Sequence, residues 1–212
     1  MSGATVHDLV ERQAAERPAA IYALATDSDA ALSYGDLARD CRSVAMLLQD
    51  LGAAPGDTIS IVMPNGLATL RVLLGAMWGG RCVNPVNLLA QPDQMRYVLA
   101  HSDCKVVVVA PDWEARVRDL LAGIERRVEV LVTDPDALRL PGEHAGADEP
   151  PPPAPDALAL LMYTSGTTGK PKGVMLTQAN LAANAHAIAA EHGLGVEDRV
   201  LAVLPLYHIN AF

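Results

Sequence analysis

The feature that most limits the possible folds of this chain is an uninterrupted β-branched run, Lys105-Val-Val-Val-Val-Ala110. A strand that is apolar at every position has no face left for water, which is typical of a parallel sheet covered by helices on both sides. Around this run, short apolar stretches alternate with stretches of helical periodicity. That alternation is the βαβα order of a doubly wound sheet, so we expect an α/β fold.

Hydrophobic periodicity and helix start and stop signals place the individual elements. Thr5, Ser33 and Thr177 stand where helix N-caps are needed, and Gly52 stands where the second helix is expected to stop. The residues 31–33 are expected to pair back on the preceding strand as a hairpin. Helices are predicted at 6–16, 34–51, 66–78, 92–101, 112–124 and 177–192, and strands at 20–25, 31–33, 58–63, 81–86, 105–110, 128–133, 157–163 and 198–204.

A change in composition divides the chain into two units. Pro150 to Pro153 and Pro155, with acidic neighbours, form a stiff and solvated connector that excludes a central strand or helix. We therefore predict two βαβ-type units: an N-terminal α/β subdomain at 1–133, a Pro-rich acidic linker at 134–156, and the start of a second, incomplete α/β subdomain at 157–212.

Charge and cysteine content exclude several classes of protein. A formal net charge of −9 argues against a nucleic-acid partner and against an anionic membrane surface. No apolar run approaches the length of a membrane span, and the first residues show no secretory signal. Cys41, Cys82 and Cys104 form no Cys-x-x-Cys pair, so we expect them to be buried thiols in a reducing compartment. The predicted location is the cytoplasm.

The stretch from Tyr163 to Gly173 (YTSGTTGKPKG) has the composition of a polyanion-binding loop. Its glycines let backbone N–H groups approach an anion closely, its Ser and Thr hydroxyls add donors, and its two lysines add charge. The other interpretation is a solvated Gly/Thr turn with two surface lysines. The loop is not the phosphate loop of purine triphosphatases, because Pro171 follows Gly169-Lys170 where that motif needs Ser or Thr.

This stretch resembles the signature loop of the adenylate-forming (AMP-binding) superfamily, which includes acyl-CoA synthetases, firefly luciferases and peptide-synthetase adenylation domains. The following segment, Leu176 to Leu181, also resembles the family, which often has His where this chain has Gln178. The segment from Leu204 to Ile209 (LPLYHI) resembles the next family motif in the spelling usual for acyl-CoA and aryl-CoA ligases. The resemblance spans essentially the whole chain and indicates the acyl-CoA synthetase/ligase branch.

The resemblance implies a two-step reaction and a set of site residues. A carboxylate attacks the α-phosphorus of ATP to give an acyl-adenylate and pyrophosphate, and a thiol, usually that of CoA, then captures the acyl group. Magnesium is expected to arrive with ATP, and no protein-only metal site is expected. Lys170 lies at a variable family position, whereas Pro171 fixes the backbone before Lys172. His208 is expected in the acyl pocket, and the ATP phosphates are expected to bind Thr164, Ser165, Gly166, Thr167, Thr168, Gly169 and Lys172.

Family members are longer than this sequence, and that difference sets further expectations. The family's adenine-stacking motif, its ribose-binding aspartate and its mobile C-terminal domain are not seen here. No catalytic residue is assigned, because the family's lysine for adenylate formation belongs to that domain. We expect an N-terminal portion of a carboxylate–CoA ligase, inactive alone and able to self-associate through an exposed sheet edge. The alternatives are part of a peptide-synthetase adenylation domain, or a short protein that only binds nucleotide or a partner.

Overall fold

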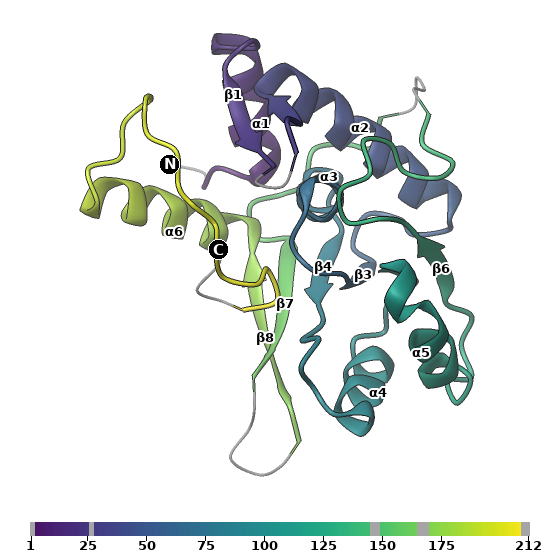
Figure 1. Cartoon of the computed structure of the whole chain (residues 1–212). Coiled ribbons are helices and arrows are strands. Elements are labelled where there is room, and N and C mark those ends of the chain that lie inside the picture. The colour runs from purple at the N-terminus through teal and green to yellow at the C-terminus, as the bar shows by residue number, and fades with distance from the viewer. Residues whose placement is uncertain (1–2, 26–27, 145–148, 165–169, 209–212) are drawn as a thin grey trace.

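The computed structural model describes residues 3–25, 28–144, 149–164 and 170–208. Its centre is a six-stranded sheet in the order β6-β5-β3-β4-β7-β8 (Figure 1). A separate two-stranded antiparallel sheet is formed by β1 (Ile21–Leu24) and β2 (Ala31–Ser33), which confirms the predicted hairpin. The predicted α/β class is confirmed.

Five strands of the large sheet run parallel, and the sixth runs against its neighbour. All four valines of β5 are fully buried, as expected of a strand covered on both faces. Val106 and Val108 belong to the apolar core on one side of the sheet, and Val107 and Val109 belong to the core on the other. The strands are β3 (Thr58–Val62), β4 (Cys82–Pro85), β5 (Val106–Val109), β6 (Glu129–Val132), β7 (Leu158–Thr164) and β8 (Lys172–Thr177).

Helices cover both faces of this sheet. The first three pack against the core that contains Val106, whereas α4 and α5 supply the other core and lie together away from α1 and α2 (Figure 1). The helices are α1 (Val6–Glu16), α2 (Tyr34–Asp50), α3 (Leu67–Trp78), α4 (Pro92–His101), α5 (Pro111–Leu121) and α6 (Gln178–Glu191). Among the described residues, no helix is both long and apolar enough to cross a bilayer.

Hydrogen bonds confirm the three predicted N-caps. The Oγ1 of Thr5, the Oγ of Ser33 and the Oγ1 of Thr177 each accept a bond from the backbone N–H three residues later, and the side chain at that position accepts from the cap N–H. Gly52 follows α2 with φ of +85°, a conformation that L side chains rarely adopt.

One sheet crosses the boundary between the two predicted units. β7 pairs in parallel with β4 through the register pair Val83 and Leu160, so the second unit extends the sheet of the first. The proline segment between them forms no helix or strand, and Glu149 makes an ion pair with Arg42 of α2 at 2.8 Å. The division at residues 134–156 stays a prediction.

The predicted strand at 198–204 is wrong. These residues form no strand, and Val200 and Leu201 are 70% and 72% exposed. Arg199 donates to the carbonyl of Ile21 in β1 at 3.3 Å, but no described strand pairs with the backbone of this segment. An apolar run is compatible with a strand but does not supply a partner strand.

Candidate functional site

The predicted phosphate-binding loop connects the two strands of the β7–β8 hairpin. Thr164 and Lys172 are direct partners in the antiparallel register, so the structure brings these two predicted residues side by side. Both are exposed. The other predicted phosphate ligands, Ser165, Gly166, Thr167, Thr168 and Gly169, lie outside the described residues.

The end of β7 lies at the carboxyl edge of the sheet. Because β7 runs parallel to β4, Thr164 emerges on the same side as the last residues of β3, β4 and β5. In open α/β sheets, ligands bind outside the carboxyl ends of the strands. The hairpin extends toward the α4 end of the molecule, with α6 at its opposite end (Figure 1). The position of Thr164 and Lys172 therefore fits a ligand site.

The charge at this end of the hairpin is positive. Lys170 and Lys172 are both exposed, and neither makes an ion pair with a described residue. A lysine ammonium is a compact charge with three donors, which suits phosphate oxygens. In a chain with a net charge of −9, such a local positive site favours an anionic ligand over the rest of the surface.

A side-chain contact fastens the hairpin to α4. The hydroxyl of Tyr163 lies 2.7 Å from Nδ1 of His101, and the His101 ring stacks on Tyr97 with centroids 5.2 Å apart. Burial raises the pKa of Tyr163 to about 12, so its phenol stays protonated at neutral pH. A Cβ at Gly173 would come 3.0 Å from Cδ1 of Leu161, the end of a flexible side chain, and 3.5 Å from the Tyr163 ring, which is an ordinary contact.

The segment that carries His208 is held against the end of β3. Asn65 donates from Nδ2 to the carbonyl of Leu204 at 2.9 Å, and its Oδ1 accepts from the N–H of Leu206 at 2.8 Å. The N–H of His208 donates to the carbonyl of Pro205 at 2.9 Å. This motif therefore also lies beside a carboxyl strand end, and the assignment of His208 to the acyl pocket stays a prediction.

Sequence reasoning missed two residues of this region. His101 shows no ligand-like spacing, and nothing in the sequence links it to Tyr163, 62 positions later. Asn65 follows a strand and a proline, which is a signal for a turn only. Its two bonds to a segment about 140 residues away emerge from the fold.

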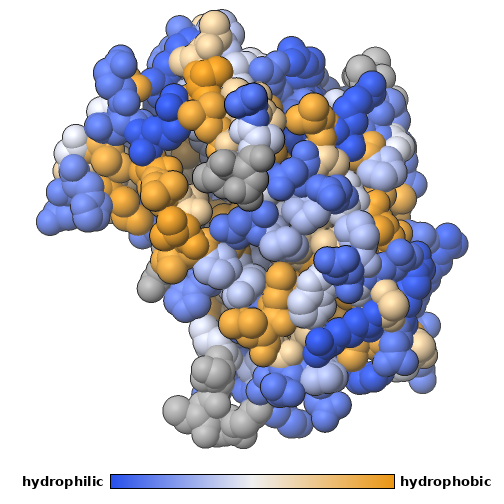
Figure 2. All heavy atoms as spheres, in the orientation of Figure 1, coloured by the Kyte–Doolittle hydropathy of each residue, from blue (hydrophilic) through white to orange (hydrophobic). Residues whose placement is uncertain are grey.

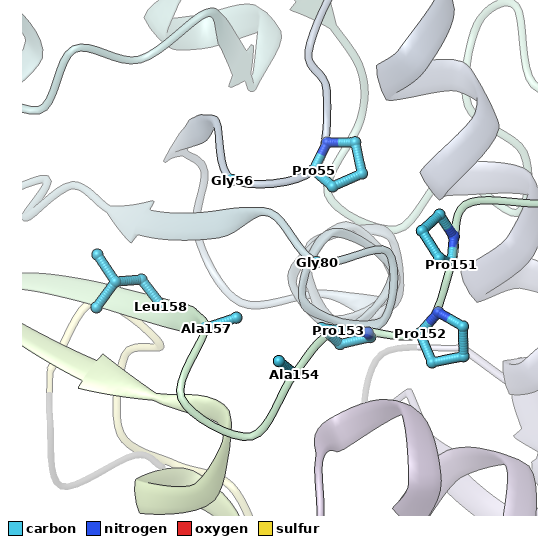
Figure 3. Close-up of a pocket in the computed structure, with 9 residues that line it drawn as sticks. All are labelled: Pro55, Gly56, Gly80, Pro151, Pro152, Pro153, Ala154, Ala157 and Leu158. Carbon is cyan, nitrogen blue, oxygen red and sulfur yellow. The ribbon is translucent and has the colours of Figure 1, made fainter.

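A shallow depression lies at the other edge of the sheet. This depression of about 390 Å³ is lined by residues that precede β3, β4 and β7 and by the proline segment (Figure 3). It therefore opens at the amino ends of the strands, away from Thr164. Its lining carries no charged side chain and consists of Pro55, Gly56, Gly80, Pro151, Pro152, Pro153, Ala154, Ala157 and Leu158.

The described residues offer no cluster of three or more His, Cys, Asp or Glu side chains that could hold a metal ion. Cys41, Cys82 and Cys104 are buried free thiols, as predicted. Burial is the main cause that raises the pKa of Cys82 to about 11, and burial also raises the pKa of Cys41. These two cysteines are therefore poor nucleophiles and poor metal ligands at neutral pH.

Comparison with known proteins assigns the chain to a family. A sulfoacetate–CoA ligase of Cupriavidus necator is 52% identical over 209 residues, which cover 97% of this chain and 41% of that protein. A feruloyl-CoA synthase of an Amycolatopsis species is 35% identical over 184 residues, which cover 85% of this chain and 35% of that protein. The chain thus spans about two fifths of the length of these relatives.

Solved structures share the fold. The crystal structure of ATP-bound MatB from Rhodopseudomonas palustris matches with a TM-score of 0.85 and 24% identity, over 99% of this chain and 42% of that one. The N-terminal domain of FACL13 from Mycobacterium tuberculosis matches with a TM-score of 0.73 and 23% identity, over 100% of this chain and 53% of that one. The sequence pattern of the family described as "AMP-binding enzyme" matches residues 10–212, and the chain therefore belongs to that family.

Proposed function

We propose that the protein containing this chain is an ATP-dependent carboxylate–CoA ligase. The observation that carries the proposal is the pairing of Thr164 with Lys172 at the carboxyl edge of the sheet, at the two ends of the loop that resembles the family signature. The carboxylate oxygen of the substrate attacks the α-phosphorus of ATP, and pyrophosphate leaves. The CoA thiolate then attacks the acyl carbon, and AMP leaves.

The residues of this chain act by positioning and by neutralising charge, since phosphoryl transfer of this kind needs no protein nucleophile. The Lys172 ammonium and the Thr164 hydroxyl hold the β- and γ-phosphate oxygens from the ends of the hairpin. Magnesium comes bound to the same phosphates. The loop residues Ser165, Gly166, Thr167, Thr168 and Gly169 complete this set, and His208 contributes to the acyl pocket.

Sulfoacetate is the first acid to test. The relative that is 52% identical over nearly the whole chain is named as a sulfoacetate–CoA ligase. Relatives that act by name on other acids are less similar: the feruloyl-CoA synthase is 35% identical, and a long-chain-fatty-acid–CoA ligase of Mycobacterium tuberculosis is 30% identical over 190 residues. We therefore place a small charged carboxylate before aromatic and fatty acids.

The test is carboxylate-dependent release of pyrophosphate by the longer protein that contains this chain. The panel comprises sulfoacetate, oxalate, ferulate and a long-chain fatty acid, each with MgATP and with or without CoA. Release that needs an acid, together with acyl-CoA as product, supports the proposal. ATP hydrolysis that is indifferent to every acid would contradict it.

The 212-residue chain by itself is proposed to be inactive, with residues 1–133 and 157–212 as two subdomains of one cytoplasmic enzyme that are joined by the pairing of β4 with β7. The family's adenine-stacking motif and ribose-binding aspartate are not seen in this sequence, so we expect weak or no binding of MgATP in calorimetry. Acyl-CoA formation by the pure chain, or micromolar ATP affinity that Lys172→Ala abolishes, would show that these residues suffice alone.

A second candidate is a peptide-synthetase adenylation domain, which passes the acyl group to a carrier protein instead of CoA. The antimetabolite synthetase AmbB of Pseudomonas aeruginosa is 32% identical over 178 residues, which cover 82% of this chain. Transfer to a phosphopantetheinyl carrier protein, without transfer to free CoA, would favour this candidate.

A further inference from the structure

Gln178, the first residue of α6, is a fully buried polar side chain at the base of the β7–β8 hairpin. It follows β8 directly, and its own N–H donates to the carbonyl of Ala157, just before β7, at 2.9 Å. The N–H of the next residue, Ala179, donates to the carbonyl of Pro155 at 2.8 Å. The backbone of this one turn therefore closes the hairpin where its two strands meet the preceding linker.

The side chain of Gln178 bonds to two helices of the first predicted unit. Its Oε1 accepts from the N–H of Val6 at 3.0 Å, and its Nε2 donates to the carbonyl of Met77 at 2.8 Å. Val6 is the first residue of α1, where backbone N–H groups have no partner inside the helix. Met77 lies in the last turn of α3, and its carbonyl also accepts from the N–H of Gly80 at 3.1 Å. One carboxamide thus joins the start of α1, the end of α3 and the start of α6.

Few side chains can make this pair of bonds. A carboxamide offers an acceptor and a donor in one planar group, whereas a carboxylate offers acceptors only and a thioether offers neither strongly. Loss of the bond to Oε1 leaves the N–H of Val6 without another partner among the described residues, and leaving a buried donor unpaired is costly. The Met77 carbonyl would keep its bond from the N–H of Gly80. The site is closely packed as well, since a Cβ at Gly3 would come 2.8 Å from Cβ of Ala179.

The hairpin is held in the sheet through β7, whose Ala159, Leu160 and Met162 are buried in the core, whereas β8 pairs with β7 alone among the described strands. The register of β7 with β4 is limited to Val83 and Leu160, and the side-chain bond between Tyr163 and His101 lies near the loop end. Six residues of extended chain separate Gln178 from Lys172, which is a distance of about 20 Å. Because β8 is a continuous strand between them, a tilt at its base moves Lys172 at its far end.

We propose that Gln178 is a positioning residue for nucleotide binding: its two bonds to α1 and α3 fix the base of the hairpin and thereby aim Lys172 at the triphosphate. This inference rests on the proposed function, because it concerns the same phosphate-binding hairpin. A residue that serves stability alone changes how much protein is folded. A positioning residue changes the Michaelis constant for the one substrate that the hairpin holds.

The experiment uses the longer protein that contains this chain, with Gln178→Met, Gln178→Glu and Gln178→His. The control is Asn184→Leu, at an exposed position on the same helix. We expect Gln178→Met and Gln178→Glu to raise KM for MgATP about five- to tenfold, with KM for the acid changed less than about twofold. We expect Gln178→His to stay near wild type, because neutral imidazole also has one donor and one acceptor nitrogen.

Two results would overturn the inference: equal changes in both Michaelis constants, or a lower melting temperature with KM for MgATP unchanged. Hydrogen exchange tests the role of Gln178 independently of the proposed enzymatic function. If the wild-type protein shows no acid-dependent activity, joint loss of protection in the first turn of α1 and at residues 172–177 in Gln178→Met still supports the coupling. Loss confined to α1 and α3 contradicts it.

Discussion

At the scale of single residues, the two lysines of the hairpin are a natural comparison. Lys172 lies inside β8 opposite Thr164, whereas Lys170 precedes the strand and pairs with no residue of β7. We expect Lys172→Ala to raise KM for MgATP at least about tenfold in the longer protein, because a charge-assisted contact to phosphate is lost. Lys170→Ala is expected to change KM for MgATP less than about threefold, because Lys170 is an exposed charge outside the strand. Steady-state kinetics with varied MgATP measures both, and equal effects would show that the fixed strand position of Lys172 does not matter.

The phenol of Tyr163 gives a second prediction at this scale. Burial raises its pKa from 10.0 to about 12, so the folded chain disfavours the phenolate. The resulting contribution to stability is complete below the unfolded pKa near pH 10 and is lost as the pH rises toward 12. We expect Tyr163→Phe to make urea-unfolding stability fall less steeply between these two pH values. Ultraviolet absorbance should show one late-titrating phenol fewer.

Tyr22 offers the matched comparison for this titration. Its pKa is also raised to about 12, mainly by burial, but it lies in β1, far along the chain from the hairpin. Tyr22→Phe should therefore remove the other late-titrating phenol while leaving the contact between Tyr163 and His101 unchanged. If Tyr163→Phe loses absorbance amplitude near pH 10 and keeps the late phase unchanged, this phenol ionises as if exposed.

Residue types and spacing predicted the hairpin loop but not its supports. The glycines, hydroxyls and lysines of the loop lie within eleven consecutive positions, so their shared chemistry is visible in the sequence. The bonds made by His101, Asn65 and Gln178 join residues 62 to 172 positions apart. Only the completed fold brings such partners together, so no local sequence pattern predicts these hydrogen bonds.

At the scale of elements, Gly75 decides how closely α2 and α3 approach. A Cβ at this position would lie 2.6 Å from Cβ of Val44 and 3.3 Å from Cα of Cys41. Helix propensity alone would make Gly75→Ala stabilising by about 1 kcal/mol. Overpacking costs about 1–3 kcal/mol, and the contact is with atoms near the α2 backbone, so we expect a net destabilisation of about 1–2 kcal/mol.

Urea unfolding of Gly75→Ala measures the net effect. Ala115→Gly, at an exposed position of α5, calibrates the propensity term and is expected to cost about 1 kcal/mol. If Gly75→Ala raises the free energy of unfolding by as much as Ala115→Gly lowers it, then α2 and α3 have room to separate and their close approach is not required.

The elements that were predicted well carry their own end signals. Three capping boxes, the glycine after α2 and the continuous valines of β5 depend on residues that are neighbours in sequence or on burial from both sides. The segment 198–204 has the composition of a strand, but a strand also needs a partner backbone, which composition cannot supply. Its exposed valines and leucines mark that lack of a partner.

At the scale of the whole molecule, the sheet is protected unevenly. The core strands are covered on both faces, but β8 is an edge strand whose outer side pairs with no described strand. Val174 and Met175 on it are 43% and 64% exposed. Apolar side chains also gather over α6 and the segment that follows it, on the left of Figure 2. An exposed apolar edge strand is a template for pairing with another chain.

We therefore expect the 212-residue chain to self-associate through β8. Sedimentation velocity at increasing protein concentration should show a growing dimer population. Met175→Lys should reduce it, because a charge on an edge strand opposes pairing. Leu138→Lys is the control: Leu138 is 71% exposed but lies in the loop after β6, so the variant loses as much apolar surface without changing the edge. If both lysine variants weaken association equally, nonspecific contacts between exposed apolar side chains drive the association. A selective effect of Met175→Lys assigns the contact to β8.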